Sequence, residues 1–349
     1  MSSRQRTILG VILVGLVVAI PTIEQNNYYL SILIMTGIWI VLTSSLNLVV
    51  GYAGQVSMCH AAFYGIGAYT SALLTLKAGW PFWIAFPIAG IGSGLFGVLI
   101  GRATNNLSGH YLAIATLVFG AIVTAVLQRW DVLAYPPGEG AIVRCISRPE
   151  PIPLLSLDFR NPLHYYYLVV IVVLATIWIV HRLANSRFGR TLKAIREDEI
   201  LAKSVGIRTA RYKTQAFTIS ALFAGLAGSL FAHYSRNITP GSFVFLESFY
   251  IVVAVIVGGA GTTGGAILGA IFIRAVQEML RVRVPYPWVP DVTTLLFGVI
   301  LIAVIVFTPT GLVGLGKRVK ASWIVTVVRS LKLAVKEKMI VSERTETAS

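Results

Sequence analysis

Long apolar runs separated by short polar segments dominate this chain of 349 residues. A helix that crosses a lipid bilayer needs about 20 mostly apolar residues, and ten runs approach that length. They lie at residues 8–23, 29–50, 60–76, 82–101, 111–127, 165–180, 217–231, 243–257, 266–280 and 292–307. The pattern predicts an all-α polytopic membrane protein with about ten transmembrane helices.

The same pattern divides the chain into three regions. We expect an N-terminal tail and first span at residues 1–28, a membrane core at 29–315 and a basic tail at 316–349. The first run shows no convincing small-residue cleavage site, so it is interpreted as a retained span and not as a signal peptide. The tail alternates apolar and basic side chains, as an amphipathic helix on an anionic membrane surface does. A specific regulatory contact is the alternative role for it.

Lysine and arginine side chains indicate the orientation, because short loops rich in them stay on the cytoplasmic side. With ten spans, the N-terminal arginines, Arg102, the 185–213 connection and the C-terminal tail fall on one face. Both termini are then cytoplasmic. The proline-rich segments at 129–163 and 285–288 fall on the opposite face as solvated connectors, and direct contact with a solute is the alternative for them.

Composition argues against several other classes of protein. The chain is 56% hydrophobic and 12% charged, and its net charge of +15 gathers in loops and the tail, unlike the basic stripe of a nucleic-acid binder. Cys59 and Cys145 have no metal or redox spacing and are expected near opposite faces, so no internal disulfide is predicted. No nucleophile with its base can be assembled, which disfavours an enzyme. No GxxxxGK[ST] motif occurs, so this chain does not bind ATP through that loop.

Two glycine-rich interruptions stand between apolar runs, at residues 51–60 and 258–265. Non-helical backbone within a membrane must be buried in protein or line a watery cavity. Paired interruptions in two halves are typical of internally repeated transporters, so a weak internal repeat is predicted. The translocation-pathway candidates are Gly54, Gln55, Ser57, Gly258, Gly259, Gly261 and Thr262. For the first interruption, a plain cytoplasmic turn followed by small-residue helix packing is an equal alternative.

The connection at 185–213 is the most highly charged part of the core. It carries eight basic and three acidic side chains among good helix formers, and Gly206 is suited to a helix C-cap. A helix of this kind could seat in a groove of a soluble partner and transmit force. An ordinary solvated basic loop is the alternative, and composition alone favours it.

Short motifs occur in order between about residues 29 and 315. They are GYAGQVS at 51–57, HAAFYGIGAYT at 60–70, GHYLAIATL at 109–117, AIREDE at 194–199, VGI at 205–207, RYK at 211–213 and GGAG at 258–261. Together they resemble the branched-chain amino acid ABC permease family of the LivM type. The resemblance implies the ABC importer permease fold, a bacterial inner-membrane location, and transport of branched-chain or related amino acids.

The resemblance also implies partners. These are a second, LivH-like permease, two cytoplasmic ATPase subunits and a periplasmic solute-binding protein, with ATP and Mg used by the partner subunits and no cofactor bound by this chain. It makes residues 190–206 the segment that rests on an ATPase, and it adds His60 to the pathway candidates. The ATPase-coupling candidates are Arg190, Arg196, Glu197, Asp198, Glu199 and Gly206.

Two departures from the family pattern matter: the outer loop bears on the solute, and Cys59 bears on close backbone packing at that position. The outer loop reads YPPGEGAIVRC at 135–145, where the family tends to have a glycine-rich run, and Cys59 stands where glycine is expected. Urea, a short amide or another small solute is therefore the alternative cargo.

An ion-coupled secondary transporter is the rival from a different class. Such transporters usually need an ionisable group near the membrane midplane. Glu247 and Glu278 are expected toward the outer ends of their spans, which leaves the span interiors without a carboxylate. A channel is disfavoured because no ring-forming filter motif occurs.

Overall fold

The computed structural model describes residues 26–129, 142–144, 146–150, 158–283, 290–307 and 311–314. Within these ranges the chain is helical apart from turns, short loops and one isolated bridge between Val143 and Ile238. The elements are α2 (Asn27–Asn47), η1 (Leu48–Tyr52), α3 (His60–Leu76), α4 (Phe82–Ala103), α5 (Gly109–Arg129), α6 (Pro162–Asn185), α7 (Arg187–Glu197), α8 (Glu199–Ser204), α9 (Thr209–Ser235), η4 (Pro240–Phe243), α10 (Phe245–Gly258), α11 (Thr263–Arg283) and α12 (Pro290–Phe307).

Every apolar run that falls in the described residues forms a helix, which confirms the all-α class. Seven helices in this part of the chain are long and apolar enough to cross a membrane. The structure thus supports a multi-pass membrane protein. The run at 8–23, the tail at 316–349, Cys145 and the loops at 135–141 and 285–288 lie outside the described residues. The total of about ten spans stays a prediction.

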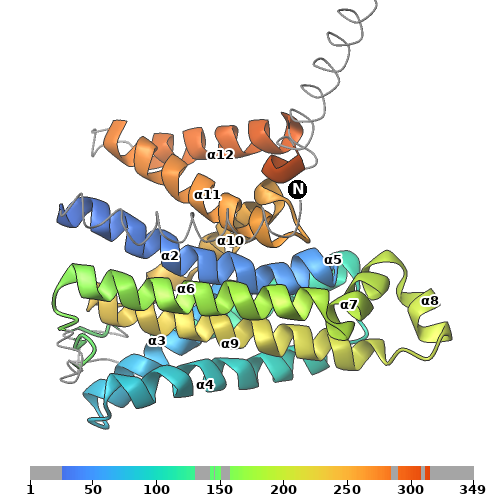
Figure 1. Ribbon diagram of the computed structural model, residues 1–349, viewed down its shortest axis with the longest axis horizontal. Coiled ribbons are helices and arrows are strands. Elements are labelled where there is room, and N and C mark those ends of the chain that lie inside the picture. The colour runs from blue at the N-terminus through green and yellow to red at the C-terminus, as the bar shows by residue number, and fades with distance from the viewer. Residues whose placement is uncertain are drawn as a thin grey trace, which may run out of the picture.

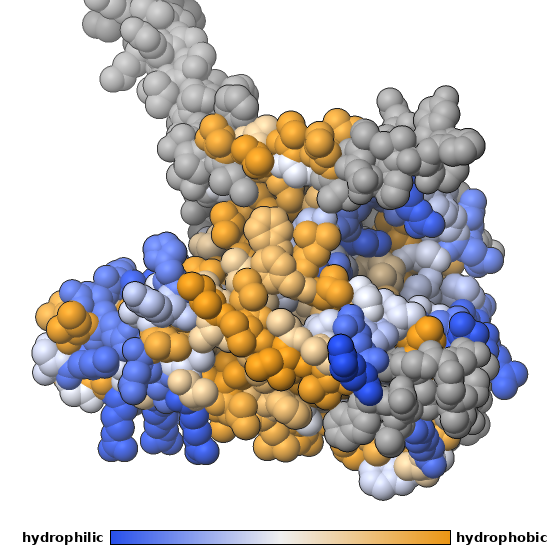
Figure 2. Space-filling view, turned by 180° about the vertical axis from the view of Figure 1, so that it is seen from behind, coloured by the Kyte–Doolittle hydropathy of each residue, from blue (hydrophilic) through white to orange (hydrophobic). Residues whose placement is uncertain are grey.

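The long helices lie in layers along one axis. Figure 1 shows α2, α6, α9 and α4 running alongside one another, with α11 and α12 over one side and α7 and α8 projecting at one end. We call this end the α7–α8 end. Figure 2 shows a broad apolar surface between two polar ends, which suits a protein whose middle lies in lipid.

Local sequence explains where several helices begin and end. Asn26 and Asn161 cap α2 and α6: their side-chain oxygens accept hydrogen bonds from the backbone N–H groups of Tyr28 and Leu163, each at 3.0 Å. Pro162 follows directly at the first position of α6, where its missing N–H costs nothing. Arg236 ends α9 in the left-handed conformation with φ 63°. Caps of this kind fix the helix ends independently of the apolar pattern.

Small residues hold α3, α4 and α9 unusually close together. A Cβ atom added to Gly67 of α3 would lie 2.3 Å from the Cα of Gly225 in α9, and one added to Gly228 would lie 2.1 Å from the carbonyl oxygen of Tyr64. The hydroxyls of Ser71 and Ser229 also meet at 2.7 Å across this contact. Close backbone approach and polar contacts are what stabilise helix pairs in lipid. The three helices form a closely packed unit beside the interruptions.

Two contacts with α5 show how deeply two turns lie in the bundle. The Met58 N–H donates to the Thr116 hydroxyl at 3.0 Å, and the Thr124 hydroxyl donates to the Phe243 carbonyl at 3.2 Å. At 1.5 Å per residue these threonines lie about 10 and about 22 Å along α5 from its start at Gly109. Both the loop before α3 and the turn before α10 therefore lie inside the membrane-spanning part.

The depth of the turn before α10 changes the interpretation of Glu247. This residue lies four positions beyond Phe243, within a segment apolar enough to span the membrane. The next residue, Ser248, accepts a hydrogen bond from the Ala61 N–H at 2.8 Å, in the first turn of α3. Glu247 thus lies deeper than the sequence analysis expects, because η4 turns back before reaching the membrane surface. Glu278 lies at the expected end, where it accepts a hydrogen bond from the Tyr28 hydroxyl at 2.6 Å.

Candidate functional site

The charged connection folds into two short helices, with a break at Asp198. The Asp198 carboxylate caps α8 by accepting hydrogen bonds from the N–H groups of Ile200 and Leu201 at 2.8 and 2.9 Å. Gly206 follows α8 with φ 83°, and its N–H donates to the Lys203 carbonyl at 3.0 Å. The glycine turn agrees with the sequence analysis. The break was missed, although an aspartate followed by a glutamate and then by apolar residues is a typical helix start.

Glu199 fastens α8 to α9. Its carboxylate pairs with the buried Lys213 ammonium of α9 at 2.5 Å and with Lys203 of α8 at 3.0 Å. Partial burial alone would raise the pKa of Glu199, but the hydrogen bonds and charges of the two lysines outweigh that effect and hold its pKa below the ordinary value. The carboxylate is therefore charged at neutral pH, and α8 is attached by an ion pair with one buried partner.

Arg196, in the last turn of α7, reaches both glycine interruptions. Its guanidinium donates a hydrogen bond to the Gly51 carbonyl. A Cβ atom on Gly54 would lie 2.6 Å from the Arg196 Cγ, and one on Gly261 would lie 2.9 Å from its Nη1. Both of these glycines also have positive φ, at 68° and 81°. Glycine is needed at both places to give Arg196 room and to form the turns.

The other coupling candidates do not reach the interruptions as Arg196 does. Arg190 is exposed and donates to the Asn185 carbonyl at 3.2 Å, and Glu197 is exposed at the end of α7. Asp198 and Glu199 serve the local fold of α8. Of the six candidates, Arg196 is the one whose side chain contacts both interruptions within the described part of the chain.

Asn47 joins the two interruptions directly. Its side-chain oxygen accepts a hydrogen bond from the Gly261 N–H at 2.9 Å, and its amide nitrogen donates to the Thr262 carbonyl at 3.1 Å. A Cβ atom on Gly51 would lie 2.3 Å from the Gly261 nitrogen, so the two chain segments are in backbone contact. Sequence reasoning missed Asn47. The available signal in the sequence was a single amide inside the apolar run at 29–50, and the structure shows that it is fully buried.

The second interruption is a tight turn between two closely packed helices. Gly258 faces the Gly265 carbonyl, where an added Cβ atom would lie only 1.9 Å away. The Thr262 hydroxyl donates to the Gly259 carbonyl at 2.8 Å and accepts from the Gly265 N–H at 3.1 Å. These contacts give Gly258, Gly259 and Thr262 a structural part in closing the turn.

The first interruption is longer and mostly buried. Its helix ends in a π-helical turn, η1, after which Gln55, Ser57 and His60 point into the bundle. The Ser45 hydroxyl lies 3.0 Å from His60 Nε2, and the Ser57 hydroxyl lies 3.3 Å from the Cys59 sulfur. Gln55 Oε1 is buried and has no hydrogen-bond partner in the described part of the chain. This burial favours the broken-helix interpretation over a plain cytoplasmic turn.

A cleft opens where α7 meets the interruptions. It has a volume of about 350 Å³ and is lined by Gly51, Tyr52, Lys193, Arg196, Glu197 and Gly261. The Lys193 ammonium lies 5.5 Å from the centre of the Tyr52 ring, a cation–π distance. Of the pathway candidates, Gly261 lines this cleft, whereas Gln55, Ser57 and His60 lie buried deeper along the first interruption.

Helices broken at membrane depth, held against one charged helix at the bundle end, define a polytopic membrane transport protein. Known sequences narrow the class. A family model described as the branched-chain amino acid transport system permease component matches residues 28–305. The chain belongs to this family, whose members are transport permeases and not enzymes, and it is a permease subunit of an ABC importer.

Individual relatives agree with the family match. The high-affinity branched-chain amino acid transport system permease protein LivM of Escherichia coli K12 is 34% identical, over 88% of this chain and 75% of that protein. LivM of Salmonella typhimurium LT2 is also 34% identical, over 80% and 68%. The autoinducer 2 import system permease protein LsrC of Shigella flexneri is 26% identical, over 67% and 66%. No solved structure matches this chain.

Proposed function

We propose that this subunit translocates branched-chain or related amino acids across a bacterial inner membrane. A periplasmic binding protein delivers the solute, a LivH-like permease completes the path, and two cytoplasmic ATPase subunits use ATP and Mg while this chain binds no cofactor. Both termini lie in the cytoplasm, on the same side as the α7–α8 end. The identity to the two LivM proteins supports the solute class.

The observation that carries the coupling proposal is the contact of Arg196 with both interruptions. A helix that holds two broken-helix junctions at once can transmit one displacement to both halves of the bundle. When the ATPase subunits close, α7 moves with them and shifts Gly51 and Gly261 together. The cleft between α7 and the interruptions leaves space for such a shift.

α8 supports the same proposal from the side of the ATPase. The apolar side chains Ile200 and Leu201 of α8, and Val205 directly after it, are 81%, 62% and 69% exposed at the polar end of the bundle. An apolar helix face left in water fits a groove in a soluble protein. The pair of Glu199 with Lys213 then holds α8 on α9 while the partner pushes on it.

Uptake and ATP hydrolysis measured together test the coupling role. In proteoliposomes holding the complete importer, we expect Arg196→Ala to lower leucine uptake about tenfold while ATP hydrolysis continues. Arg190→Ala is the matched control, because that guanidinium bonds only a neighbouring carbonyl, and it should transport normally. Alanine at all four positions from Arg196 to Glu199 should abolish uptake and leave membrane insertion intact. Normal uptake by the Arg196 variant would contradict the assignment.

The similarity to LsrC keeps a different small solute as the second candidate. Calorimetry of the cognate binding protein against leucine, isoleucine, valine, urea and short amides separates the two. Binding of leucine or its neighbours supports the proposal, and binding of urea or an amide alone replaces the solute class.

The ion-coupled alternative gains a carboxylate from Glu247, which lies within a span. Uptake that persists without ATP and follows a proton or sodium gradient would favour it over the ATP-driven importer.

A further inference from the structure

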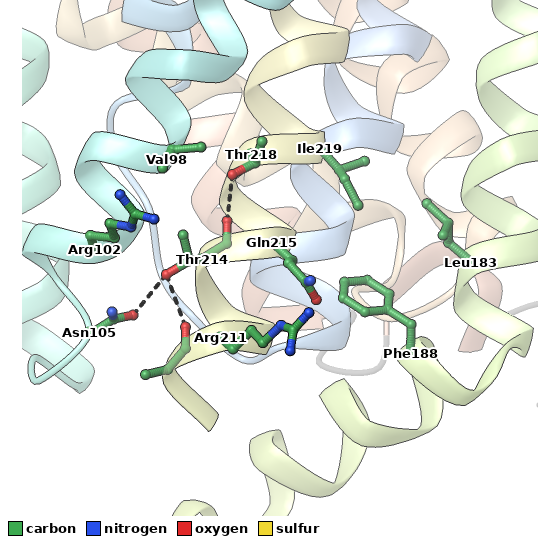
Figure 3. A pocket seen from close by; sticks show the side chains of 11 residues that line it. Val98, Arg102, Asn105, Leu183, Phe188, Arg211, Thr214, Gln215, Thr218 and Ile219 are labelled. Atoms are coloured by element: carbon green, nitrogen blue, oxygen red, sulfur yellow. Dashed lines mark hydrogen bonds between the residues drawn. The ribbon is translucent and has the colours of Figure 1, made fainter. Parts of the chain in front are cut away.

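A groove crosses the surface of α9 near the α7–α8 end (Figure 3). α9 forms its floor, α4 one wall, and Leu183 of α6 with Phe188 of α7 the other wall. The groove has a volume of about 790 Å³. Its remaining lining residues are Val98, Arg102, Asn105, Ala210, Arg211, Thr214, Gln215, Thr218 and Ile219.

The lining changes from charged to apolar with depth. Arg102 is in the last turn of α4 and Arg211 in the first turn of α9, so both guanidiniums lie at the level where these spans end. Thr214 and Gln215 follow one turn deeper. Ile219 is eight residues beyond Arg211, which is about 12 Å further into the bundle. A phospholipid has the same order of parts, with a phosphate, then ester groups, then acyl chains.

The charges of the groove are not neutralised by the protein. Within the described residues, neither Arg102 nor Arg211 forms an ion pair, and none of the lining residues is acidic. Asn105 is occupied on the protein side, since its amide lies 3.1 Å from the Thr214 hydroxyl. The two arginines are therefore left to face an anion from outside the chain.

We propose that this groove binds an anionic phospholipid of the cytoplasmic leaflet, with its headgroup at the level of Arg102 and Arg211 and an acyl chain against Leu183, Phe188 and Ile219. Basic pockets between transmembrane helices suit lipid phosphates. The site also touches the coupling helix: Phe188 is the second residue of α7, and its ring lies 5.9 Å from that of Tyr212 in α9. A bound lipid thus steadies the junction from which α7 departs.

Native mass spectrometry of the full chain, with the subunits that co-purify, tests this site. We compare phosphatidylglycerol with phosphatidylcholine of equal acyl length, and expect a clear preference for the anionic lipid. The double variant Arg102→Gln/Arg211→Gln should lower phosphatidylglycerol affinity about thirty-fold, since each basic side chain near an anionic membrane surface contributes a factor of about five and the two factors multiply. Lysine at both positions should largely restore the preference and also shows that the helices still pack.

The matched control is Arg187→Gln/Arg208→Gln, which removes equal charge from exposed positions at the same end outside the groove lining. This control should keep the lipid preference. Equal loss in both double variants would overturn the proposal, as would an unchanged preference in the groove variant. Equal affinity for soluble glycerol phosphate would show a free-anion site and overturn it too. The assignment of the lipid to the cytoplasmic leaflet rests on the proposed function. Lipid binding is measured without transport, so a failed lipid test does not contradict the proposed function, and failed transport does not contradict lipid binding.

Discussion

The two glycine interruptions look alike in sequence and differ in structure. The second is a short turn in which Gly258 packs on Gly265 and Thr262 closes the backbone. The first is longer, begins with a π-helical turn and leaves the buried Gln55 oxygen without a partner in the described region. The second interruption is thus a compact, hydrogen-bonded turn, and the first is a longer loop that enters the bundle with one buried polar atom unpaired in the described region.

This difference suggests that the two interruptions behave differently during transport. A turn closed by its own hydrogen bonds resists deformation, whereas a loop with an unsatisfied buried group has less to lose on rearranging. We expect the first interruption to change shape during transport and the second to rotate as a unit. Asn47 and Arg196 hold the two together, so variants at their contacts separate these behaviours.

The largest effect is expected at Gly51. Gly51→Ala would place a Cβ atom 1.9 Å from the Asn47 side-chain oxygen and 2.3 Å from the Gly261 nitrogen. To relieve these clashes the two interruptions must move apart, which lowers the stability of the fold by about 3 kcal/mol. The amount of folded protein and the rate of uptake should therefore both fall sharply. Fluorescence-detected gel filtration after heating measures the loss.

The control for that variant is Gly264→Ala. Gly264 belongs to the second interruption, but a Cβ atom there meets nothing within 4 Å. It should behave like the parent protein. Equal damage from both substitutions would mean that glycine content, and not the contact at Gly51, sets stability.

A smaller effect is expected when the link itself is cut. Asn47→Leu keeps the volume but leaves the Gly261 N–H and the Thr262 carbonyl without their partner, at about 2 kcal/mol. The thermal midpoint should fall by several degrees and uptake should drop, because α2 no longer follows the second interruption. Asn185→Leu is the comparison, since within the described residues the Asn185 side chain bonds only His181 of its own helix, at its carbonyl and its ring. If both variants melt alike, Asn47 does not join the halves.

The smallest effect concerns the attachment of α8 and depends on pH. The pKa of Glu199 is lowered in the folded protein, so its ion pairs stabilise α8 above the ordinary value of 4.5 and are lost as pH falls below it through the folded value. The protection factors of the amides at 199–207, which are corrected for the intrinsic pH dependence of exchange, should stay high down to about pH 5 and fall below 4.5.

Substitution isolates that titration. In Glu199→Gln the protection factors of α8 should be lower at neutral pH and should change little between pH 6 and 4, whereas the exposed Glu197→Gln should follow the parent protein. A pH response that survives in the Glu199 variant would assign it to another group.

The helices were largely predictable because each span needs a long apolar run, and runs such as 60–76 coincide with α3. The Gly206 turn was predictable for a similar local reason. Glu247 was misjudged, since its depth depends on where η4 turns back, and that turn is held by Thr124 of α5. The length of an apolar run in the sequence carries no information about such a tertiary contact.

The site was predictable in its parts and not in its assembly. Glycine and charge clusters drew attention to Gly261 and Arg196, but nothing local shows that they meet Gly51 across the bundle. Asn47 was overlooked because a single amide among apolar residues looks unremarkable until its partners, more than 200 positions away, are known.

The π-helical turn at the end of α2 also determines how the two halves of the molecule are rotated relative to each other. The Ala53 N–H bonds the Leu48 carbonyl, five residues back, so the turn holds one residue more than an α-turn. Removing one residue from it would swing everything beyond by about 100° and carry Gly51 away from its counterpart. The one extra residue of this turn, and not its side-chain chemistry, therefore sets the register of the two halves of the molecule.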